Sequence, residues 1–143
     1  MTLQQQQVHM QTAYLFASLS KARRAKVGAI LVTDSGVTIS GVNGTPSGTD
    51  NNCENEHRNN NTKLFTLVTK PEVIHAELNC ILKAAKEGVS ILGSDLFVTL
   101  SPCLSCAAMI KQAGIKKVYF REQYRDVSGV QYLQDNGVEV EQI

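Results

Sequence analysis

The sequence predicts an α/β sandwich, and three observations support this prediction. Two apolar runs rich in β-branched residues, 27–33 and 37–42, flank the turn Asp34-Ser35-Gly36 and indicate a hairpin. Beyond residue 72, segments of helical periodicity alternate with segments of strand character, which is typical of parallel pairing. The chain has 143 residues, a length that fits one domain with one substantial core. We therefore expect a single domain over residues 1–143.

The first predicted element is a helix over about residues 5–21, with Val8, Leu15 and Leu19 among its apolar positions. The run 27–33 that follows is almost continuously apolar, as expected of a strand covered on both faces. Together with its hairpin partner, it predicts one edge of the sheet.

A long polar region separates the hairpin from the rest of the chain, over about residues 43–72. It is rich in Asn, Gly, Thr and Ser, which predicts a loop, and loops of this length are usually functional or mobile. For its most polar part, residues 51–61, the alternative is a plain disordered insertion.

The second half of the chain is predicted to contain three helices and three strands. Gly88 and Gly114 are placed to end the first two helices. In chain order, the expected elements are a helix over 75–87, a strand over 95–100, a helix over 103–113, a strand over 116–120, a short helix over 128–137 and a strand over 138–143.

The composition narrows the class of ligand. Fourteen basic and thirteen acidic side chains leave a net charge of +1, whereas a sequence-independent nucleic-acid binder needs a basic surface. Trp is absent and aromatic residues make up only 6%, so a row of stacking platforms for single strands is not expected. We therefore expect a small-molecule ligand, which can be anionic, and no nucleic-acid partner.

The chain opens with a polar segment, and no apolar run approaches the length of a membrane span. The four cysteines therefore suggest metal ligands or buried thiols before disulfides. Cys80 lies in an apolar run and is expected to be a small buried hydrophobe. We expect no membrane association and a reducing, cytoplasmic setting.

Two short motifs carry the chemistry: His75-Ala76-Glu77, and Pro102-Cys103-Leu104-Ser105-Cys106. Each lies where an extended segment gives way to a predicted helix. Cys103 and Cys106 are three residues apart, so their sulfur atoms face the same way on a first helical turn. If the two helices run side by side, one imidazole and two thiols meet, and one nitrogen with two sulfur ligands is typical of zinc.

Three protein ligands leave the fourth tetrahedral position of zinc to water, which is the catalytic pattern. Glu77 begins the same helix as His75 but projects differently, so it is the candidate proton carrier beside the metal. The order H-x-E followed by P-C-x-x-C is the signature of zinc nucleobase deaminases.

Three alternatives stay open for these motifs. Glu77 could simply complement the helix dipole. A closed structural zinc site would take its fourth ligand from one of four residues, and a Cys-x-x-Cys pair can serve redox chemistry. The candidate fourth ligands are His9, Cys53, His57 and Cys80.

Longer stretches carry a resemblance to a known family: KVGAILV, GVNGTPSG, HAELN, TLSPCLSCA and QAGIKKVYFREQYRD. On these residues the chain resembles the cytidine deaminase superfamily and, within it, the deoxycytidylate (dCMP) deaminases, including phage and other viral members. GVNGTPSG is the discriminating stretch, because the zinc motifs are shared with deaminases of cytidine, tRNA adenosine, guanine and DNA cytosine. The resemblance implies a three-layer α/β/α fold around a five-stranded mixed sheet.

The resemblance also implies an activity, the zinc-dependent hydrolysis of dCMP to dUMP, in a bacterial or virus-infected host cell. One Zn²⁺ per chain would be held by His75, Cys103 and Cys106, and Glu77 would move protons. A homohexamer activated by dCTP and inhibited by dTTP is implied as well, with Mg²⁺ able to accompany the triphosphates. Some viral relatives accept dCTP as a substrate.

Residues for substrate and effectors follow from the same resemblance and from the positions of cations. Asn43 is implied to bind the sugar, while Arg121, Tyr124 and Arg125 follow a predicted strand and are candidates for the substrate phosphate. Solvated surface charge and an exposed loop are the alternatives. The candidate effector residues are Arg24, Lys26, Asn43, Gly44, Lys83 and Lys86.

The chain departs from the family pattern in three places. Leu104 stands where the family usually has Pro, and Val42-Asn43-Gly44 replaces a Gly-Asn-Gly-like triplet. Cys53 and His57 look like an incomplete set for the second zinc of some viral members, so we predict no second site. Besides a nucleotide deaminase, two hypotheses remain: a deaminase of polynucleotides and a non-catalytic zinc-stabilised binding module.

Overall fold

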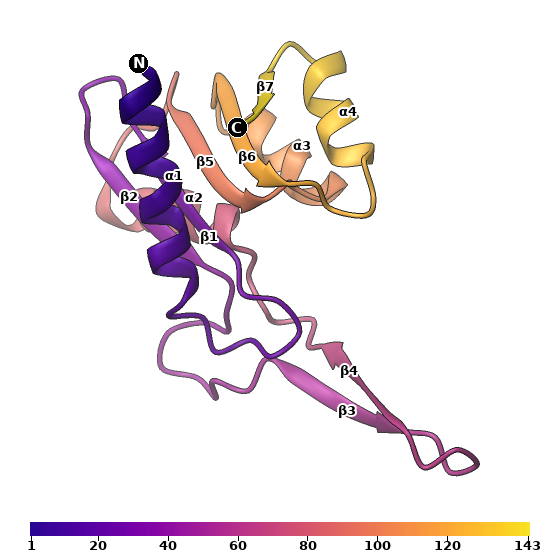
Figure 1. Cartoon of the computed structure of the whole chain (residues 1–143). Helices are drawn as coiled ribbons and strands as arrows, with labels where there is room; N and C mark the ends of the chain where they lie inside the picture. The colour runs from indigo at the N-terminus through magenta and orange to yellow at the C-terminus, as the bar shows by residue number, and fades with distance from the viewer.

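A five-stranded mixed β-sheet forms the centre of the molecule, with helices on both faces (Figure 1). The computed structural model describes residues 1–143. The order of strands across the sheet is β2-β1-β5-β6-β7. The elements are α1 (Leu3–Ala17), β1 (Gly28–Val32), β2 (Thr38–Val42), β3 (Glu54–Arg58), β4 (Phe65–Thr69), α2 (Ala76–Glu87), β5 (Asp95–Leu100), α3 (Leu104–Gln112), β6 (Lys117–Glu122), α4 (Ser128–Asp135) and β7 (Glu139–Gln142).

The pairing of the strands matches the pattern predicted from the sequence. β1 and β2 form the expected antiparallel hairpin, with Leu31 opposite Ile39. β5 joins the other edge of β1 in antiparallel fashion, and β6 and β7 follow it in parallel. Because both faces of the sheet are covered, every residue of β1 is buried.

Two apolar layers lie on the two faces of the sheet. Under α1, Met10 packs against Phe97, whose ring stacks on Tyr119 with 4.5 Å between the ring centroids. On the other face, α2, α3 and α4 cover a larger core that includes Leu96 and Ile110. Alternate residues of each strand supply the two layers, as the pleat of a strand requires.

Helix α1 does not use the apolar positions that the sequence suggested. The helix ends at Ala17 and not at residue 21, and Val8, Leu15 and Leu19 are exposed, with 52%, 72% and 63% of their surface accessible, so the apolar positions that indicated the helix do not lie on its buried side. The buried side of α1 carries Met10 and Ala13 instead. A small side chain is needed at Ala13 because the helix lies close to Gly28 of β1 at this point, and a large one would hold the two backbones apart.

The polar region differs from the uninterrupted loop that was expected over residues 43–72. β3 and β4 pair as an antiparallel ribbon that extends away from the sheet (Figure 1). They contact each other and no other helix or strand. An exposed ribbon needs no apolar alternation, so the sequence Glu54–Arg58, ENEHR, gives no periodic signal for a strand.

The two motif helices begin where the sequence predicted. His75 and Cys103 are the N-cap residues of α2 and α3, and Gly88 ends α2 in the left-handed conformation at φ 68°. The last helix and strand lie within the predicted ranges. None of the helices combines the length and the apolar character that crossing a membrane would need.

Candidate active site

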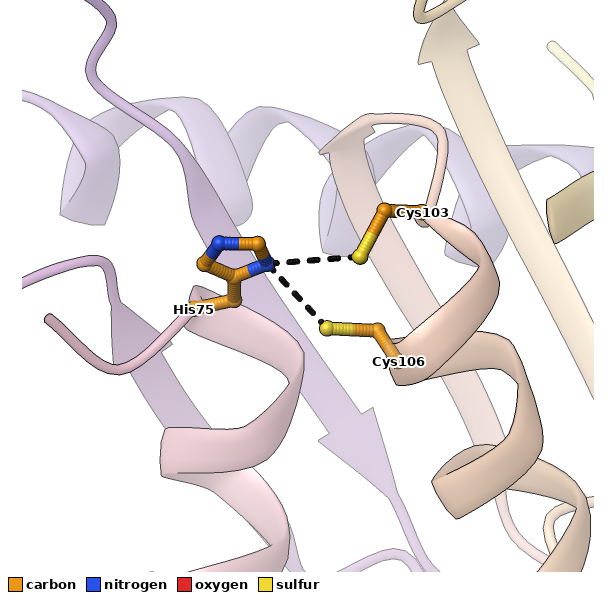
Figure 2. Close-up of side chains that lie close together, drawn as sticks. All are labelled: His75, Cys103 and Cys106. Atoms are coloured by element: carbon orange, nitrogen blue, oxygen red, sulfur yellow. Dashed lines mark hydrogen bonds between the residues drawn. The ribbon is translucent and has the colours of Figure 1, made fainter. Parts of the chain in front are cut away.

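Three side chains with metal-binding atoms meet at the N-termini of α2 and α3 (Figure 2). His75 and Cys103 each have extended backbone at the N-cap position, which turns their side chains outward from the helix axis. Cys106 lies one turn into α3, on the same side as Cys103. The Nδ1 atom of His75 is 3.2 Å from Sγ of Cys106 and 3.6 Å from Sγ of Cys103. The clustering predicted from the two motifs is thus present.

These distances fit a tetrahedral zinc site. Zinc binds imidazole nitrogen and thiolate sulfur at about 2.0 and 2.3 Å, which sets the nitrogen and sulfur ligands roughly 3.5 Å apart. All four cysteines are free thiols, so no disulfide competes for the pair. Burial raises the pKa of the Cys106 thiol, and neighbouring Glu77 and Cys103 raise it further. A dication here would offset that cost, because it favours the thiolate that binds it.

Glu77 lies beside the three ligands without belonging to their cluster. It is the second residue of α2 and is only 3% exposed, which is unusual for a carboxyl group. Burial raises the pKa of Glu77, while the charge of His75 and a hydrogen bond with Cys106 oppose that rise. A buried carboxyl with a raised pKa can both accept and return a proton near neutral pH.

Two glycines let neighbouring elements approach the motif helices closely. A Cβ atom on Gly41 of β2 would lie 2.9 Å from the amide nitrogen of Cys80, on the first turns of α2. A Cβ atom on Gly129 of α4 would lie 2.7 Å from the carbonyl carbon of Cys103. Both distances are shorter than ordinary contacts, so the positions of the two helix starts depend on these glycines.

Backbone pairing holds the segment that leads into His75. Gly44 and Ile74 form an isolated antiparallel bridge, in which the Ile74 amide donates to the Gly44 carbonyl at 2.8 Å. One turn into α2, the Asn79 amide group donates to the Val42 carbonyl oxygen at 2.6 Å. The metal-binding motif is thereby tied to the end of β2.

A cavity of about 320 Å³ opens beside Glu77, His75 and Cys103. This volume is at the lower end of the range for small-molecule sites. Its walls come from the segment before β1, the ends of β2, β4 and β5, and the start of β3. The other lining residues are Ala22, Arg24, Ala25, Val27, Asn43, Cys53, Glu54, Thr69, Val73, Ala76, Leu100, Ser101 and Tyr124.

Two of the four predicted substrate residues line this cavity. The Asn43 side chain accepts a hydrogen bond from the Val27 amide at 2.9 Å and donates one to the Ala25 carbonyl at 2.8 Å. It therefore supports one wall as well as lining it. The Tyr124 amide donates to Oγ of buried Ser101 at 2.7 Å, next to the second zinc motif.

The other two predicted substrate residues lie outside the cavity lining. Arg121 donates from Nε to the Ile143 carbonyl at 3.0 Å and from Nη2 to Oε1 of Gln7 at 2.8 Å. Its guanidinium therefore faces the C-terminal residue and α1. Arg125 lies over the ring of Tyr124, 5.7 Å from its centroid.

The six candidate effector residues do not gather in one place. Arg24 and Asn43 line the cavity, and Nη1 of Arg24 donates to Oγ1 of Thr69 at 3.1 Å. Lys83 donates from Nζ to the Ser40 carbonyl. Gly44 pairs with Ile74, and Lys26 and Lys86 are exposed.

Sequence reasoning missed Glu54, which is only 2% exposed and lines the cavity. It lies in the most polar part of the chain, where no pattern singled it out from Glu56 two residues later. Cys53, next to it, is buried in the cavity wall, whereas His57 is exposed on β3.

Comparison with known proteins places this site in a family. The model of the cytidine and deoxycytidylate deaminase zinc-binding region matches residues 3–122. The chain belongs to this family. It is 35% identical to the deoxycytidylate deaminase of Enterobacteria phage T4, over 80% of this chain and 76% of that protein. The human deoxycytidylate deaminase is 38% identical, over 82% of this chain and 65% of that protein.

A solved structure extends the likeness to the whole fold. The crystal structure of dCMP deaminase from the cyanophage S-TIM5, in complex with dCMP and dUMP, superposes with a TM-score of 0.88. It is 46% identical and covers 100% of this chain and 99% of that one. The resemblance to the deoxycytidylate deaminases and the predicted fold are thus confirmed, and the chain is a deaminase, a hydrolase.

Proposed function

We propose that this protein hydrolyses dCMP to dUMP and ammonia, with zinc held by His75, Cys103 and Cys106. The observation that carries the proposal is a buried carboxyl, Glu77, beside a cluster of one imidazole and two thiols in a cavity of small-molecule size. Named deoxycytidylate deaminases among the relatives support the choice of substrate.

Zinc, when bound, supplies the acidification of a water molecule to a pKa near about 7. Glu77 would accept a proton from a water molecule in the cavity and pass it to the ring nitrogen of cytosine. The water oxygen would bond to C4, and Glu77 would carry the remaining proton of that oxygen to the exocyclic nitrogen, so that the bond from C4 to this nitrogen breaks and ammonia leaves. Burial of Glu77 keeps bulk water from competing for these protons.

Arg24 is the proposed partner of the substrate phosphate. It is the only arginine or lysine that lines the cavity, and Thr69 holds its guanidinium at the wall. Asn43 and Tyr124 line the same cavity and are proposed to contact the sugar and the base. We rank Arg121 and Arg125 below Arg24 for the phosphate, because their guanidinium groups are engaged elsewhere.

Regulation and assembly are further parts of the proposal. We infer activation by dCTP, inhibition by dTTP and a homohexameric state from family membership, and dCTP is a candidate second substrate. Among the six candidate effector residues, Lys26 and Lys86 are exposed and their side chains form no hydrogen bond or ion pair, so both are free to meet an anionic effector. A substrate panel run with and without dCTP and dTTP tests the activation, the inhibition and the second substrate.

The panel contains dCMP, dCTP, cytidine and a short single-stranded DNA. We expect dCMP to have the highest kcat/KM, since a net charge of +1 offers little attraction to polynucleotides. Deamination of the DNA strand at a comparable rate would overturn the choice of substrate.

The role of Glu77 is tested by Glu77→Gln, with Glu72→Gln as the matched control, because Glu72 is exposed just before the same helix. Loss of a general acid–base group costs about 10²- to 10⁴-fold in rate. We expect that loss in kcat for Glu77→Gln only, with zinc content and thermal stability retained. Undiminished turnover would refute the assigned role, and a protein without bound zinc would refute the metal site.

A further inference from the structure

Glu54 is a buried carboxyl group in the wall of the cavity that the mechanism above does not use. It begins β3, is 2% exposed and lines the same cavity as His75 and Glu77. Burying a carboxyl is costly unless its oxygen atoms are satisfied. The contacts of its two oxygen atoms therefore indicate what the residue does.

One oxygen is fully engaged by the backbone. Oε2 accepts hydrogen bonds from two successive amides, Arg23 at 2.8 Å and Arg24 at 3.0 Å. These bonds hold the segment before β1 against the base of the ribbon, and they place Arg24 at the cavity wall.

The other oxygen accepts no hydrogen bond. Oε1 is buried and has no hydrogen-bond partner, although it forms an ion pair with Nε of Arg23 at 3.6 Å. That separation is too long for a hydrogen bond. Buried acceptor atoms are nearly always hydrogen-bonded, so we expect a bound ligand to supply the missing donor.

Glu54 is ionised at neutral pH, so the donor it needs is a neutral or cationic group. Burial alone would raise the pKa of Glu54, but the two amide hydrogen bonds and the charge of Arg23 together lower it. A carboxylate oxygen accepts hydrogen bonds more strongly than a neutral oxygen and accepts only. It would repel the phosphate of a nucleotide and attract a hydroxyl group.

We propose that Oε1 of Glu54 accepts a hydrogen bond from the 3′-hydroxyl of the substrate and so selects a nucleotide in which that hydroxyl is intact. The inference rests on the proposed function. A 2′-deoxynucleoside 5′-monophosphate has a single free hydroxyl on its sugar, so this group is the only sugar donor available. The exocyclic amine of the base is the other neutral donor, and the mechanism assigns it to the zinc motif and Glu77.

The experiment compares kcat/KM for dCMP and for 2′,3′-dideoxycytidine 5′-monophosphate, which lacks only the 3′-hydroxyl. It uses the full-length zinc-loaded protein, Glu54→Gln, Glu54→Ala and a control variant, Glu56→Gln. Glu56 is on the same strand and also pairs with Arg23, at 3.3 Å, but it does not line the cavity. Thermal unfolding of each variant checks that it is folded.

We expect the parent protein to prefer dCMP by about 10- to 100-fold, the usual effect of a hydrogen bond to a charged group. Glu54→Ala should bring this ratio close to one by lowering the rate with dCMP, Glu54→Gln should lower it partly, and Glu56→Gln should leave it unchanged. Glutamine keeps an oxygen for the two amides, so it separates a folding defect from a lost substrate contact.

Three outcomes would overturn the inference. In the first, both substrates slow equally in the Glu54 variants, which would make Glu54 a positioning residue for the Arg23–Arg24 segment. In the second, Glu56→Gln lowers the ratio as much as Glu54→Ala. In the third, the parent protein turns over both nucleotides equally. A parent protein that deaminates neither nucleotide but does deaminate another substrate would instead overturn the proposed function.

Discussion

Replacing Gly129 by alanine should displace the backbone at Cys103 and so disturb the proposed zinc site. Gly129 lies in α4, and a Cβ atom there would come 2.7 Å from the carbonyl carbon of Cys103. Ordinary contacts between carbon atoms are about 3.5 to 4.0 Å, so one of the two backbones must move by roughly 1 Å. Because Cys103 is a ligand of the proposed zinc site, part of that movement reaches its sulfur atom.

Two opposing effects set the change in stability. Overpacking costs typically 1 to 3 kcal/mol, whereas alanine gains up to about 1 kcal/mol over glycine in a helix. We therefore expect the free energy of unfolding to fall by about 0 to 3 kcal/mol. A misplacement of about 1 Å in a catalytic site can cost about 100-fold in rate, so activity should fall even in a variant that remains folded.

The assays are kcat/KM for dCMP, zinc content after dialysis, and urea denaturation. Gln134→Ala is the matched control, since Gln134 is an exposed residue of the same helix. We expect Gly129→Ala to lose about 100-fold in kcat/KM and part of its zinc, and the control to lose neither. A Gly129→Ala variant with parental kcat/KM and zinc content would refute the inference that α4 positions Cys103.

Three further predictions concern the metal, a buried carboxylate and the ribbon. Cys106→Ser, or a strong chelator added to the parent protein, should remove zinc and turnover together. Catalytic zinc sites have three protein ligands, and the variant would keep only two. Turnover that survives the loss of zinc would contradict the assignment. The pKa of Glu54 is lowered from its ordinary 4.5, so its ionised form stabilises the fold fully above that value, and the contribution is lost as the pH falls towards the folded-state pKa. The stability gap between the parent and Glu54→Gln in urea should therefore shrink between pH 7 and pH 3, and a constant or growing gap would count against the buried ion. Joining His57 directly to Thr66 by Asn-Gly removes the outer ribbon, which packs only on itself. The thermal midpoint of that variant should change by no more than about 2 °C, as for surface changes of about 0.5 kcal/mol, and a large fall would show that the ribbon is packed against something in solution.

Local spacing was enough to predict the candidate metal ligands and the candidate proton carrier. Cys103 and Cys106 are three residues apart on a helix start, and His75 and Glu77 share the start of another. Within each helix start, the relative positions of the two side chains follow from helix geometry over a single turn. The sequence therefore predicted that His75, Cys103 and Cys106 lie together, as they do in the structure, and it predicted the hairpin with its parallel continuation, which the structure confirms.

The cavity walls could not be predicted in the same way, because their residues are far apart in the chain. Arg24 meets Thr69 across 45 residues, and Glu54 meets the amide of Arg23 across 31. Only the folded chain brings such residues together, since no local periodicity specifies a contact over that distance. The same limit applies to Arg121, whose guanidinium faces Ile143 and Gln7 instead of the cavity.

The ribbon and helix α1 show a second limit of sequence reasoning. Apolar periodicity reports which side of an element is buried, so it is silent for β3, whose side chains beyond Glu54 are all exposed. For α1, the apolar periodicity placed Leu15 among the apolar positions of the helix, whereas the side that packs closely on β1 carries small residues such as Ala13. The residue types that make up the candidate site were thus determined by the sequence over a few residues. The shape of the site was decided by the tertiary structure, because it depends on contacts that only chain folding creates.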